Sequence, residues 1–284
     1  MTSSSASASV LTRHTIDTPT VPDVLTLPHP STSMIEGIPV LGFINPTSLF
    51  ERLVQESRQA RQTATQRIVH YLNIHVANSA VVNPDLKRSL QAADIVYCDG
   101  AGIVVGSRWM GKPLPTRLTA ADWFLDMLRY FSKAGLSVYL LGGKPGVPEQ
   151  ALDAILEQVP DHSVVGAHHG FILNDESIES AVIEEINALN PDIVILGFGT
   201  PLQERWIAKH KHSLKVPMLY GIGAVMDFIS GTVPRCPEWM GKNGLEWLYR
   251  LMVEPSRMVG RYVVGNPWFL ARIAFQKHVL KAAG

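Results

Sequence analysis

The sequence predicts an α/β fold in which a Rossmann-like, mainly parallel sheet carries helices on both faces and is followed by a helical C-terminal appendage. Short apolar runs alternate with amphipathic stretches between residues 67 and 230, the pattern that consecutive βαβ units produce. The runs are apolar at nearly every position, as expected of strands that are buried on both faces. After Pro234 the alternation ends, and helical segments separated by prolines follow.

Each predicted strand is followed by a segment with helical periodicity. Two helix starts carry recognisable signals: Asn174-Asp175-Glu176 offers a capping side chain, and Thr200-Pro201 offers a proline in the first turn. The predicted strands are 67–72, 94–98, 136–142, 163–170, 192–199 and 216–223, and the predicted helices lie near 76–91, 101–110, 119–135, 147–159, 174–190, 200–212 and 224–230.

These patterns divide the chain into three parts. Residues 1–34, rich in Ser, Thr and Pro, are expected to form a disordered tail, since they lack the basic and apolar regions of a secretory signal. Residues 35–234 are expected to form the Rossmann-like domain and residues 235–284 the appendage. Hydrophobic residues make up 46% of the 284 positions, which suffices for a core, but no apolar run approaches the ~18–20 residues of a membrane span.

The charge distribution distinguishes the C-terminal end from the rest. The formal net charge is zero, which argues against a nucleic-acid-binding protein. Residues 235–284, however, hold eight Lys and Arg against three acids, a net charge of +5, together with several aromatic side chains. This combination favours a membrane surface as partner, the alternative being a solvated cationic helix face. The two cysteines, Cys98 and Cys236, lie far apart and favour neither a disulfide scaffold nor a zinc site.

Polar residues follow the predicted strands where ligands bind in open α/β sheets, beyond the carboxyl ends of the strands. Asp99 follows the strand 94–98, where a carboxylate can accept the proton of a hydroxyl group. The neighbouring glycines, Gly100 and Gly102, would let a substrate approach the backbone. Alternatively, Asp99 caps the helix that begins at Ala101.

Two glycine-rich turns follow further strands. Gly142 and Gly143 begin a turn whose backbone N–H groups can hold a phosphate, although an ordinary strand-to-helix turn explains them equally. The turn has neither the GxGxxG nor the P-loop spacing. In the turn 197–204, which contains Gly199, Gln203 could hydrogen-bond a nucleobase or sugar, whereas Glu204 is interpreted as part of a solvated helix face.

A third turn, 221–227, contains Gly223 and Asp227. Asp227 is either a ribose ligand or a buried structural acid.

The sequence contains basic side chains that could neutralise a bound diphosphate, but it lacks the usual motif for a metal ion that would do so. It contains no DxD motif, so a bound diphosphate would be neutralised by backbone amides and by cationic side chains. Arg250, Arg257 and Arg261 are spaced i, i+7, i+11, and on one continuous helix they would lie within a sector of about 40°. Pro255 can instead begin a new helix. Arg108, Lys112 and Arg117 are further candidates for binding the diphosphate.

The motifs, in this order, resemble the bacterial glycosyltransferase family WecG/TagA/CpsF, whose members transfer a sugar from a UDP-sugar to a lipid-linked acceptor. The resemblance covers about residues 36–262, and the stretch YLNIHVAN is also similar to the xanthan-type subgroup that adds glucose. The matching stretches are LNIHVANSAVV, ADIVYCDGAGIVVGSRWMGKPLPTRLTAADW, LGGKPGV, PDIVILGFGTPLQERWI, GIGAVMDFISGTVPRCPEW and GLEWLYRLMVEPSRMVGRY.

The resemblance assigns roles to individual residues. It implies that Asp99 is the catalytic base and Asn73 an active-site asparagine. Two departures stand out, because Tyr71 replaces a common threonine and Gly260 replaces the first of two arginines. By the same resemblance, Arg117, Gln203, Arg250, Arg257 and Arg261 would bind substrate. The substrate-binding candidates also include the glycines of the turns after the strands and the residue that departs from the family pattern: Gly142, Gly143, Gly199, Gly223 and Tyr71.

The resemblance also implies an inverting reaction without cofactor or metal at the cytoplasmic face of the inner membrane. The expected partners are a UDP-sugar donor, a polyprenyl-diphosphate-linked sugar acceptor in exopolysaccharide synthesis, and the membrane surface, which the C-terminal helices contact. A homo-oligomer is left open. The alternatives are a nucleotide-sugar epimerase or oxidoreductase, for which the chain lacks the GxGxxG fingerprint near Asn73, and a non-catalytic membrane scaffold.

Overall fold

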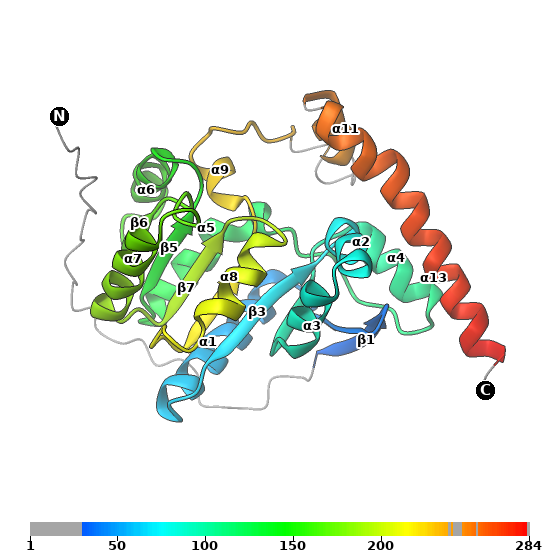
Figure 1. The fold of residues 1–284 in the computed structure, drawn as a ribbon, viewed down its shortest axis with the longest axis horizontal. Coiled ribbons are helices and arrows are strands. Elements are labelled where there is room, and N and C mark those ends of the chain that lie inside the picture. The colour runs from blue at the N-terminus through cyan, green and yellow to red at the C-terminus, as the bar shows by residue number, and fades with distance from the viewer. Residues whose placement is uncertain (1–29, 238–239, 241–245, 254, 283–284) are drawn as a thin grey trace. The chain divides into compact units, whose positions relative to one another are not determined.

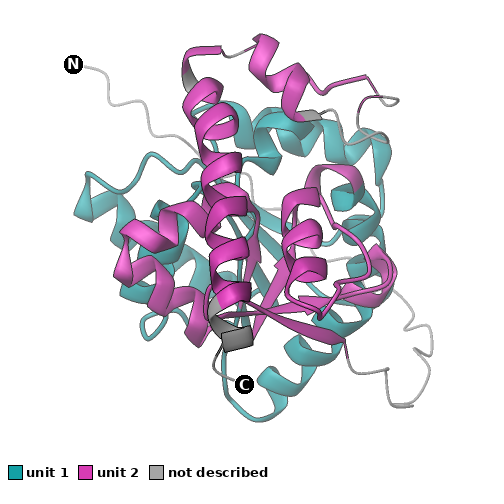
Figure 2. Ribbon diagram, turned by 90° about the vertical axis from the view of Figure 1, so that its right-hand side faces the viewer, with its two compact units in different colours: residues 1–25, 50–68, 123–233 teal, residues 26–49, 69–122, 234–284 magenta. Residues whose placement is uncertain are grey.

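The computed structural model describes residues 30–237, 240, 246–253 and 255–282, which form two compact units (Figure 2). Unit 1 comprises residues 50–68 and 123–233, and unit 2 comprises residues 30–49, 69–122 and the described part of 234–284. The two helices α1 (Pro46–Gln62) and α5 (Ala120–Lys133) begin with residues of unit 2 and continue in unit 1.

Unit 1 contains four parallel strands in the order β8-β7-β5-β6 (Figure 1). The strands are β5 (Val138–Gly142), β6 (Val164–His168), β7 (Ile193–Gly197) and β8 (Met218–Gly221). The helices that follow them are α6 (Val147–Gln158), α7 (Glu176–Leu189), α8 (Leu202–His210) and the short α9 (Val225–Ile229).

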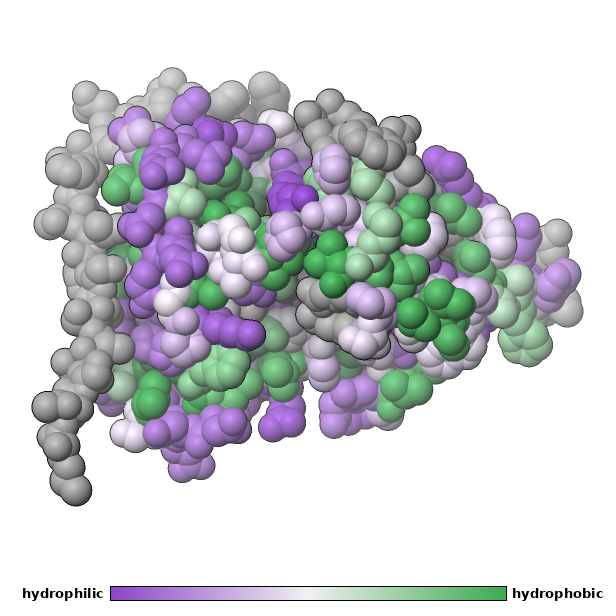
Figure 3. Space-filling model, turned by 90° about the horizontal axis from the view of Figure 1, so that it is seen from above, coloured by the Kyte–Doolittle hydropathy of each residue, from purple (hydrophilic) through white to green (hydrophobic). Residues whose placement is uncertain are grey.

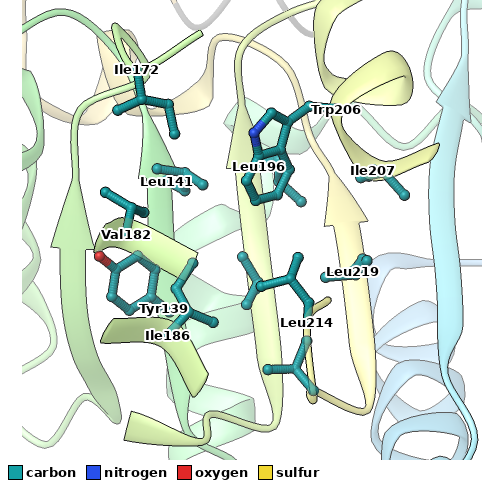
Figure 4. Packing of buried hydrophobic residues seen from close by; sticks show 12 residues of the cluster. Tyr139, Leu141, Ile172, Val182, Ile186, Leu196, Trp206, Ile207, Leu214 and Leu219 are labelled. Atoms are coloured by element: carbon teal, nitrogen blue, oxygen red, sulfur yellow. The ribbon is translucent and has the colours of Figure 1, made fainter. Parts of the chain in front are cut away.

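Both faces of the unit 1 strands are covered. Alternate residues of β5 and β7, such as Tyr139 and Leu196, form a cluster with Val182 of α7 and Trp206 of α8 (Figure 4). The intervening residues of these strands point to the opposite face, because side chains alternate along a strand. They are buried as well: Val138, Leu140, Ile193 and Ile195 are each 0% exposed.

Unit 2 contains the strand order β1-β2-β4-β3. The strands are β1 (Ser31–Ile35), β2 (Ile38–Gly42), β3 (Arg67–Leu72), whose first two residues belong to unit 1, and β4 (Ile95–Cys98). Strand β4 is parallel to both β2 and β3, so the carboxyl ends of these three strands lie at one edge. The helices are α2 (Ile74–Val82), α3 (Pro84–Ala92), α4 (Ala101–Trp109), α11 (Glu246–Val253), α12 (Pro255–Val259), the π-helix η1 (Gly260–Val264) and α13 (Gly265–Ala282).

The hairpin of β1 and β2 was not expected from the sequence. Ser31 to Ile35 pair antiparallel with Ile38 to Gly42, so regular structure begins within the segment that the sequence assigned to a disordered tail. Residues 1–29 lie outside the described residues. The turn is closed by Glu36 and Gly37, whose φ angles of 52° and 82° match the two-residue turns that join such strands.

The C-terminal helix α13 packs against α2 and α4 of its own unit. Phe269 and Ile273 of α13 are both 0% exposed, and a Cβ on Gly106 of α4 would lie 3.2 Å from the Phe269 ring. Within 235–284, the described residues 246–253 and 255–282 are helical, and α13 completes the core of unit 2 rather than standing apart from the fold.

The six predicted strands and the α/β class are confirmed; β3 has its predicted bounds, and the other five strands are shorter by one or two residues at one or both ends. The predicted helix near 76–91 is two helices, because Asn83 caps α3 and Pro84 occupies its first position. Asp175 caps α7 as expected, whereas Pro201 is the N-cap of α8 and not its first residue. None of the described helices has the combination of length and apolar character that crossing a bilayer requires.

Candidate active site

Asn73 and Asp99 meet at the carboxyl edge of unit 2. Asn73 follows β3 and Asp99 follows the neighbouring strand β4, and the Asn73 Nδ2 donates to Asp99 Oδ2 over 3.2 Å. The Asn73 Oδ1 accepts from the Val76 backbone at 3.0 Å, which caps α2 and fixes the amide orientation. Asp99 is held in turn by its backbone N–H, which donates to Leu72 O at 2.9 Å. Sequence and structure therefore agree in bringing these two residues together.

Asp99 does not cap the helix that follows it. The N-cap of α4 is Gly100, without a side-chain capping bond. A Cβ on Gly100 would lie 3.2 Å from the Asn73 Cβ, and one on Gly102 would overlap the Ile74 side chain at 2.1 Å. The two glycines thus let the beginnings of α2 and α4 approach each other, and this approach, not an opening for substrate, explains them in the structure.

Arg117 lies in the same part of unit 2. The residue after it, Leu118, donates its backbone N–H to Cys98 O at 2.7 Å, which ties the segment to the end of β4. Burial raises the pKa of the Cys98 thiol to about 12, and the charges of Asp99 and Arg117 act on the same thiol in opposite directions. The Arg117 Nη1 donates to Thr119 Oγ1 at 2.9 Å. A carboxylate and a guanidinium therefore flank Cys98.

Tyr71 is placed less favourably for substrate binding. It is 8% exposed in β3, and its ring lies 6.4 Å from that of Tyr97, its register partner in β4. Its contact with an acceptor stays a prediction.

In unit 1, close packing explains why glycine occupies positions 142 and 143. A Cβ on Gly142 would lie 2.6 Å from the Cα of Gly197, and one on Gly143 would lie 2.6 Å from the Val147 side chain. Gly142 therefore lets the ends of β5 and β7 approach. In contrast, a Cβ on Gly199, whose φ is +76°, would meet nothing within 4 Å. Of these glycines, Gly199 is the one with open space beside it.

Gln203 and Glu204 are buried at the start of α8. Gln203 is 0% exposed, its Oε1 accepts from Gly223 N at 3.0 Å and its Nε2 donates to Glu204 Oε1 at 3.1 Å. Glu204 is 1% exposed, so its interpretation as a solvated residue is wrong. The missed signal is Thr200, four residues earlier, whose hydroxyl reaches the same oxygen at 2.8 Å. A direct contact of Gln203 or Gly223 with a nucleotide stays a prediction.

Two other polar groups lie beside the turns of unit 1. The Asp227 Oδ1 lies 3.7 Å from the position of a Cβ on Gly143, so this acid adjoins the glycine-rich turn after β5. His168 is the last residue of β6, and its ring centre lies 4.3 Å from that of His169. Gly170 N donates to Gly143 O at 2.8 Å, which places the histidines near that turn.

The three arginines of the C-terminal segment do not share one straight α-helix. Arg250 lies on α11, Arg257 on α12 and Arg261 in the π-helix η1. Pro255 begins α12, and η1 has the wider turn of a π-helix, so of the two possibilities the structure shows a new helix at Pro255 and not one continuous α-helix. The side chain of Arg257 lies outside the described residues. Of the other cations, Arg108 and Lys112 are exposed.

Comparisons with known proteins agree with the motifs. The sequence profile of the glycosyl transferase WecG/TagA/CpsF family matches residues 37–283. Among similar proteins is an N-acetylglucosaminyldiphosphoundecaprenol N-acetyl-beta-D-mannosaminyltransferase of Staphylococcus aureus (strain NCTC 8325), 32% identical over 78% of this chain and 82% of the relative. The protein of the same name from Bacillus subtilis (strain 168) is 29% identical over 67% of this chain and 73% of the relative. The chain thus belongs to the WecG/TagA/CpsF family and is a glycosyltransferase.

Proposed function

We propose that this glycosyltransferase moves glucose from UDP-glucose to a polyprenyl-diphosphate-linked sugar, with inversion of configuration. The observation that carries the proposal is the bond between Asn73 Nδ2 and Asp99 Oδ2, at the carboxyl ends of two neighbouring parallel strands. This edge is where open α/β sheets bind ligands, and a carboxylate fixed there suits a general base.

In this mechanism Asp99 takes the proton of the acceptor hydroxyl. The hydroxyl oxygen forms a bond to the anomeric carbon while the bond from that carbon to the diphosphate oxygen breaks, and UDP leaves with the electron pair. One displacement of this kind turns an α-linked donor into a β-linked product. The role of Asn73 is to hold the carboxylate in orientation, since its own amide is fixed by Val76 N.

The donor diphosphate is proposed to be bound without a metal ion. The sequence contains no DxD motif, and Gly143 and Gly199 have the positive φ angles of turns whose amides can face an anion. Arg117, Arg250, Arg257 and Arg261 are proposed to supply positive charge. Activity should therefore persist in EDTA.

The lipid-linked acceptor is proposed from the names of the relatives, which act on a diphosphoundecaprenol-linked sugar. A membrane surface at the cytoplasmic face is proposed to bind the C-terminal helices, because large apolar side chains are exposed there amid positive charge. Figure 3 shows such side chains in the right-hand part of the view, which α13 occupies in Figure 1. The large exposed apolar side chains of the C-terminal helices include Met252 (62% exposed), Val263 (57%), Val264 (64%) and Phe275 (71%).

Two sugars are candidates for the group that is transferred, glucose and N-acetylmannosamine. The similarity of YLNIHVAN to the xanthan-type subgroup favours glucose, whereas the relatives are named for transfer of N-acetylmannosamine. The test offers the full-length protein a panel of UDP-sugars with a synthetic prenyl-diphospho-glucose and a prenyl-diphospho-N-acetylglucosamine, with EDTA present, and identifies products by mass.

A product heavier by one hexose, formed from UDP-glucose, supports the proposal. A product formed only from UDP-N-acetylmannosamine contradicts the proposed sugar but not the reaction. No transfer to either lipid, with a thermal shift caused by NAD and none by UDP, would instead support a nucleotide-sugar epimerase or oxidoreductase. Binding to vesicles alone would support a scaffold.

A further inference from the structure

We infer that Glu204 is a positioning residue, which holds the Gln203 amide so that Gln203 joins the turn after β8 to the turn after β7. The inference rests on the proposed function, in which the turns at this edge of unit 1 bind the donor diphosphate. Neither residue is proposed to touch the reacting atoms.

The hydrogen bonds form one continuous chain. Thr200 Oγ1 and Gln203 Nε2 both donate to Glu204 Oε1, at 2.8 and 3.1 Å. Gln203 Oε1 in turn accepts from Gly223 N at 3.0 Å. The backbone N–H of Gly223 can only donate, so the amide oxygen must face it and the amide nitrogen must face Glu204. The Gly223 N–H and the acceptor at position 204 therefore require the same orientation of the Gln203 amide, and Glu204 adds the bond that holds the amide nitrogen.

The joined turns meet at the end of β7. Ile222 N donates to Leu196 O at 2.9 Å, and a Cβ on Gly197 would lie 3.1 Å from Gly223 O. Gly199, which has open space beside it, lies between Gly197 and the start of α8 at Leu202. The position of the Gly199 turn thus depends on both of its ends, one in β7 and one in the network of Glu204.

Glu204 is buried, so it is not a surface charge that merely contacts solvent. At 1% exposure, its carboxyl group has lost its hydration, and Oε2 accepts no hydrogen bond from any side chain or backbone group of the described residues. Removing this carboxyl group from water makes folding less favourable, a cost that a solvent-exposed glutamate would not have. Burial also raises the pKa of Glu204, although the bonds from Thr200 and Gln203 act against it. Both protonation states keep an acceptor at Oε1, so the inferred role requires geometry and not charge.

The test measures UDP binding to the full-length protein by calorimetry. Glu204→Ala removes the acceptor and should weaken UDP binding by about tenfold or more. Glu204→Gln retains an acceptor and should restore binding to within about threefold of the unaltered protein. Thr200→Val removes one donor to Glu204 with little change in shape and should weaken UDP binding by an intermediate factor. It provides the test if Glu204→Ala fails to fold.

Glu179→Ala is the matched control. Glu179 is also buried, at 5% exposure, and also holds α8, through Trp206 Nε1 at 2.9 Å and Lys209 Nζ at 2.6 Å, but none of these bonds involves the turns. It should lower Tm as Glu204→Ala does while leaving UDP binding within about threefold. In turnover assays, Glu204→Ala should raise the KM for the donor and leave the KM for the lipid acceptor unchanged.

The possible failures are distinguishable. If the unaltered protein binds no UDP, the proposed function is contradicted. If it binds UDP and Glu204→Ala binds equally tightly, or if Glu179→Ala loses as much affinity, the inference is overturned. A loss in Glu204→Gln equal to that in Glu204→Ala also overturns it, because Glu204 would then act through its charge.

Discussion

Among single residues, Asp99 carries the chemistry of the proposed reaction. Its backbone N–H donates to the Leu72 carbonyl, and the Asn73 amide donates to its Oδ2. Since Gly100 is the N-cap residue of α4, the Asp99 side chain is not the cap of that helix. A substitution there should therefore affect catalysis more than stability.

Asp99→Asn should lower turnover by about 10²- to 10⁴-fold, the usual contribution of a general base, with little change in Tm. Steady-state kinetics with saturating donor and acceptor measure the effect, and circular dichroism checks the fold. Turnover close to that of the unaltered protein would remove Asp99 from the role of base.

His70 sets a pH dependence of stability in unit 2. It is 1% exposed in β3, and burial lowers its pKa to about 4 from an ordinary value near 6.5. Below pH 6.5 the unfolded chain binds a proton that the folded chain does not, so stability is complete above pH 6.5 and is lost as the pH falls toward 4. The loss should be on the order of 3 kcal/mol.

Urea unfolding at pH 7.5 and at pH 4.5 measures this loss. His70→Gln, which cannot take up the proton, should show a smaller difference between the two pH values. Because His162, His169 and His210 also have lowered pKa values, the comparison between the two proteins is decisive, not the slope of either alone. Identical differences in both proteins would contradict the role of His70.

Among the elements, α13 is joined to the rest of unit 2 by the polar contacts of Arg272 as well as by its buried apolar side chains. Arg272 Nε donates to Glu36 Oε1 at 2.6 Å, and its Nη2 donates to Asn78 Oδ1 at 2.7 Å. The guanidinium also lies 3.8 Å from the centre of the Trp268 ring. Glu36, which sits in the turn between β1 and β2 with a positive φ, is thereby held by the far end of the chain.

Arg272→Met should destabilise the docking of α13 by about 2 kcal/mol, because it leaves the half-buried Glu36 carboxylate without its cation. Hydrogen exchange of the α13 amides should become faster by a corresponding factor. Lys277→Met removes the same charge from the same helix and should leave exchange nearly unchanged. Equal acceleration in both variants would show that net charge, not the Glu36 contact, matters.

The glycine turns of unit 1 allow a paired prediction. Gly142→Ala should destabilise by about 3 kcal/mol or more, since its Cβ would lie 2.6 Å from the backbone of Gly197. Gly199→Ala has open space and should cost only about 1 kcal/mol, the cost of its positive φ. Thermal unfolding of the two variants tests the order, and a Gly199→Ala protein less stable than Gly142→Ala would contradict it.

The strands of unit 1 were predictable because apolar runs buried on both faces leave a continuous signal in the sequence. The hairpin of β1 and β2 was not, because its turn uses Glu36 where asparagine or glycine is usual, and the ion pair with Arg272 spans 236 positions. The proximity of Asn73 and Asp99 fits their places after two of the predicted strands, while their roles in the reaction stay predictions. The burial of Glu204 was not predictable, because its neighbours Arg205 and Leu202 are exposed and give this helix start the pattern of a solvated face, although Thr200 and Gln203 bond the Glu204 carboxylate.

For the whole molecule, the C-terminal helices combine two properties. One set of side chains, including Phe269 and Ile273, is buried in unit 2, while another set, including Val263, Val264 and Phe275, remains exposed. Deleting these helices would therefore uncover part of the unit 2 core as well as remove the proposed membrane contact. Substitution of exposed residues tests membrane binding without that side effect.

The triple variant Val263→Ser, Val264→Ser, Phe275→Ser should bind anionic phospholipid vesicles about 10- to 100-fold more weakly, because less apolar area can leave water. Sedimentation with vesicles measures the binding. Leu156→Ser with Ile178→Ser, at exposed apolar positions of unit 1, is the control and should bind normally. Equal loss in both variants, or none in the triple variant, would contradict a membrane role for the C-terminal helices.

The account's central claim is a single displacement assisted by one carboxylate. It is tested most directly by the anomeric configuration of the new linkage, read from the one-bond carbon–hydrogen coupling in the NMR spectrum of product made from an α-linked UDP-sugar. We predict a β-linkage, formed by the unaltered protein and at a greatly reduced rate by Asp99→Asn. An α-linkage would contradict the proposed mechanism.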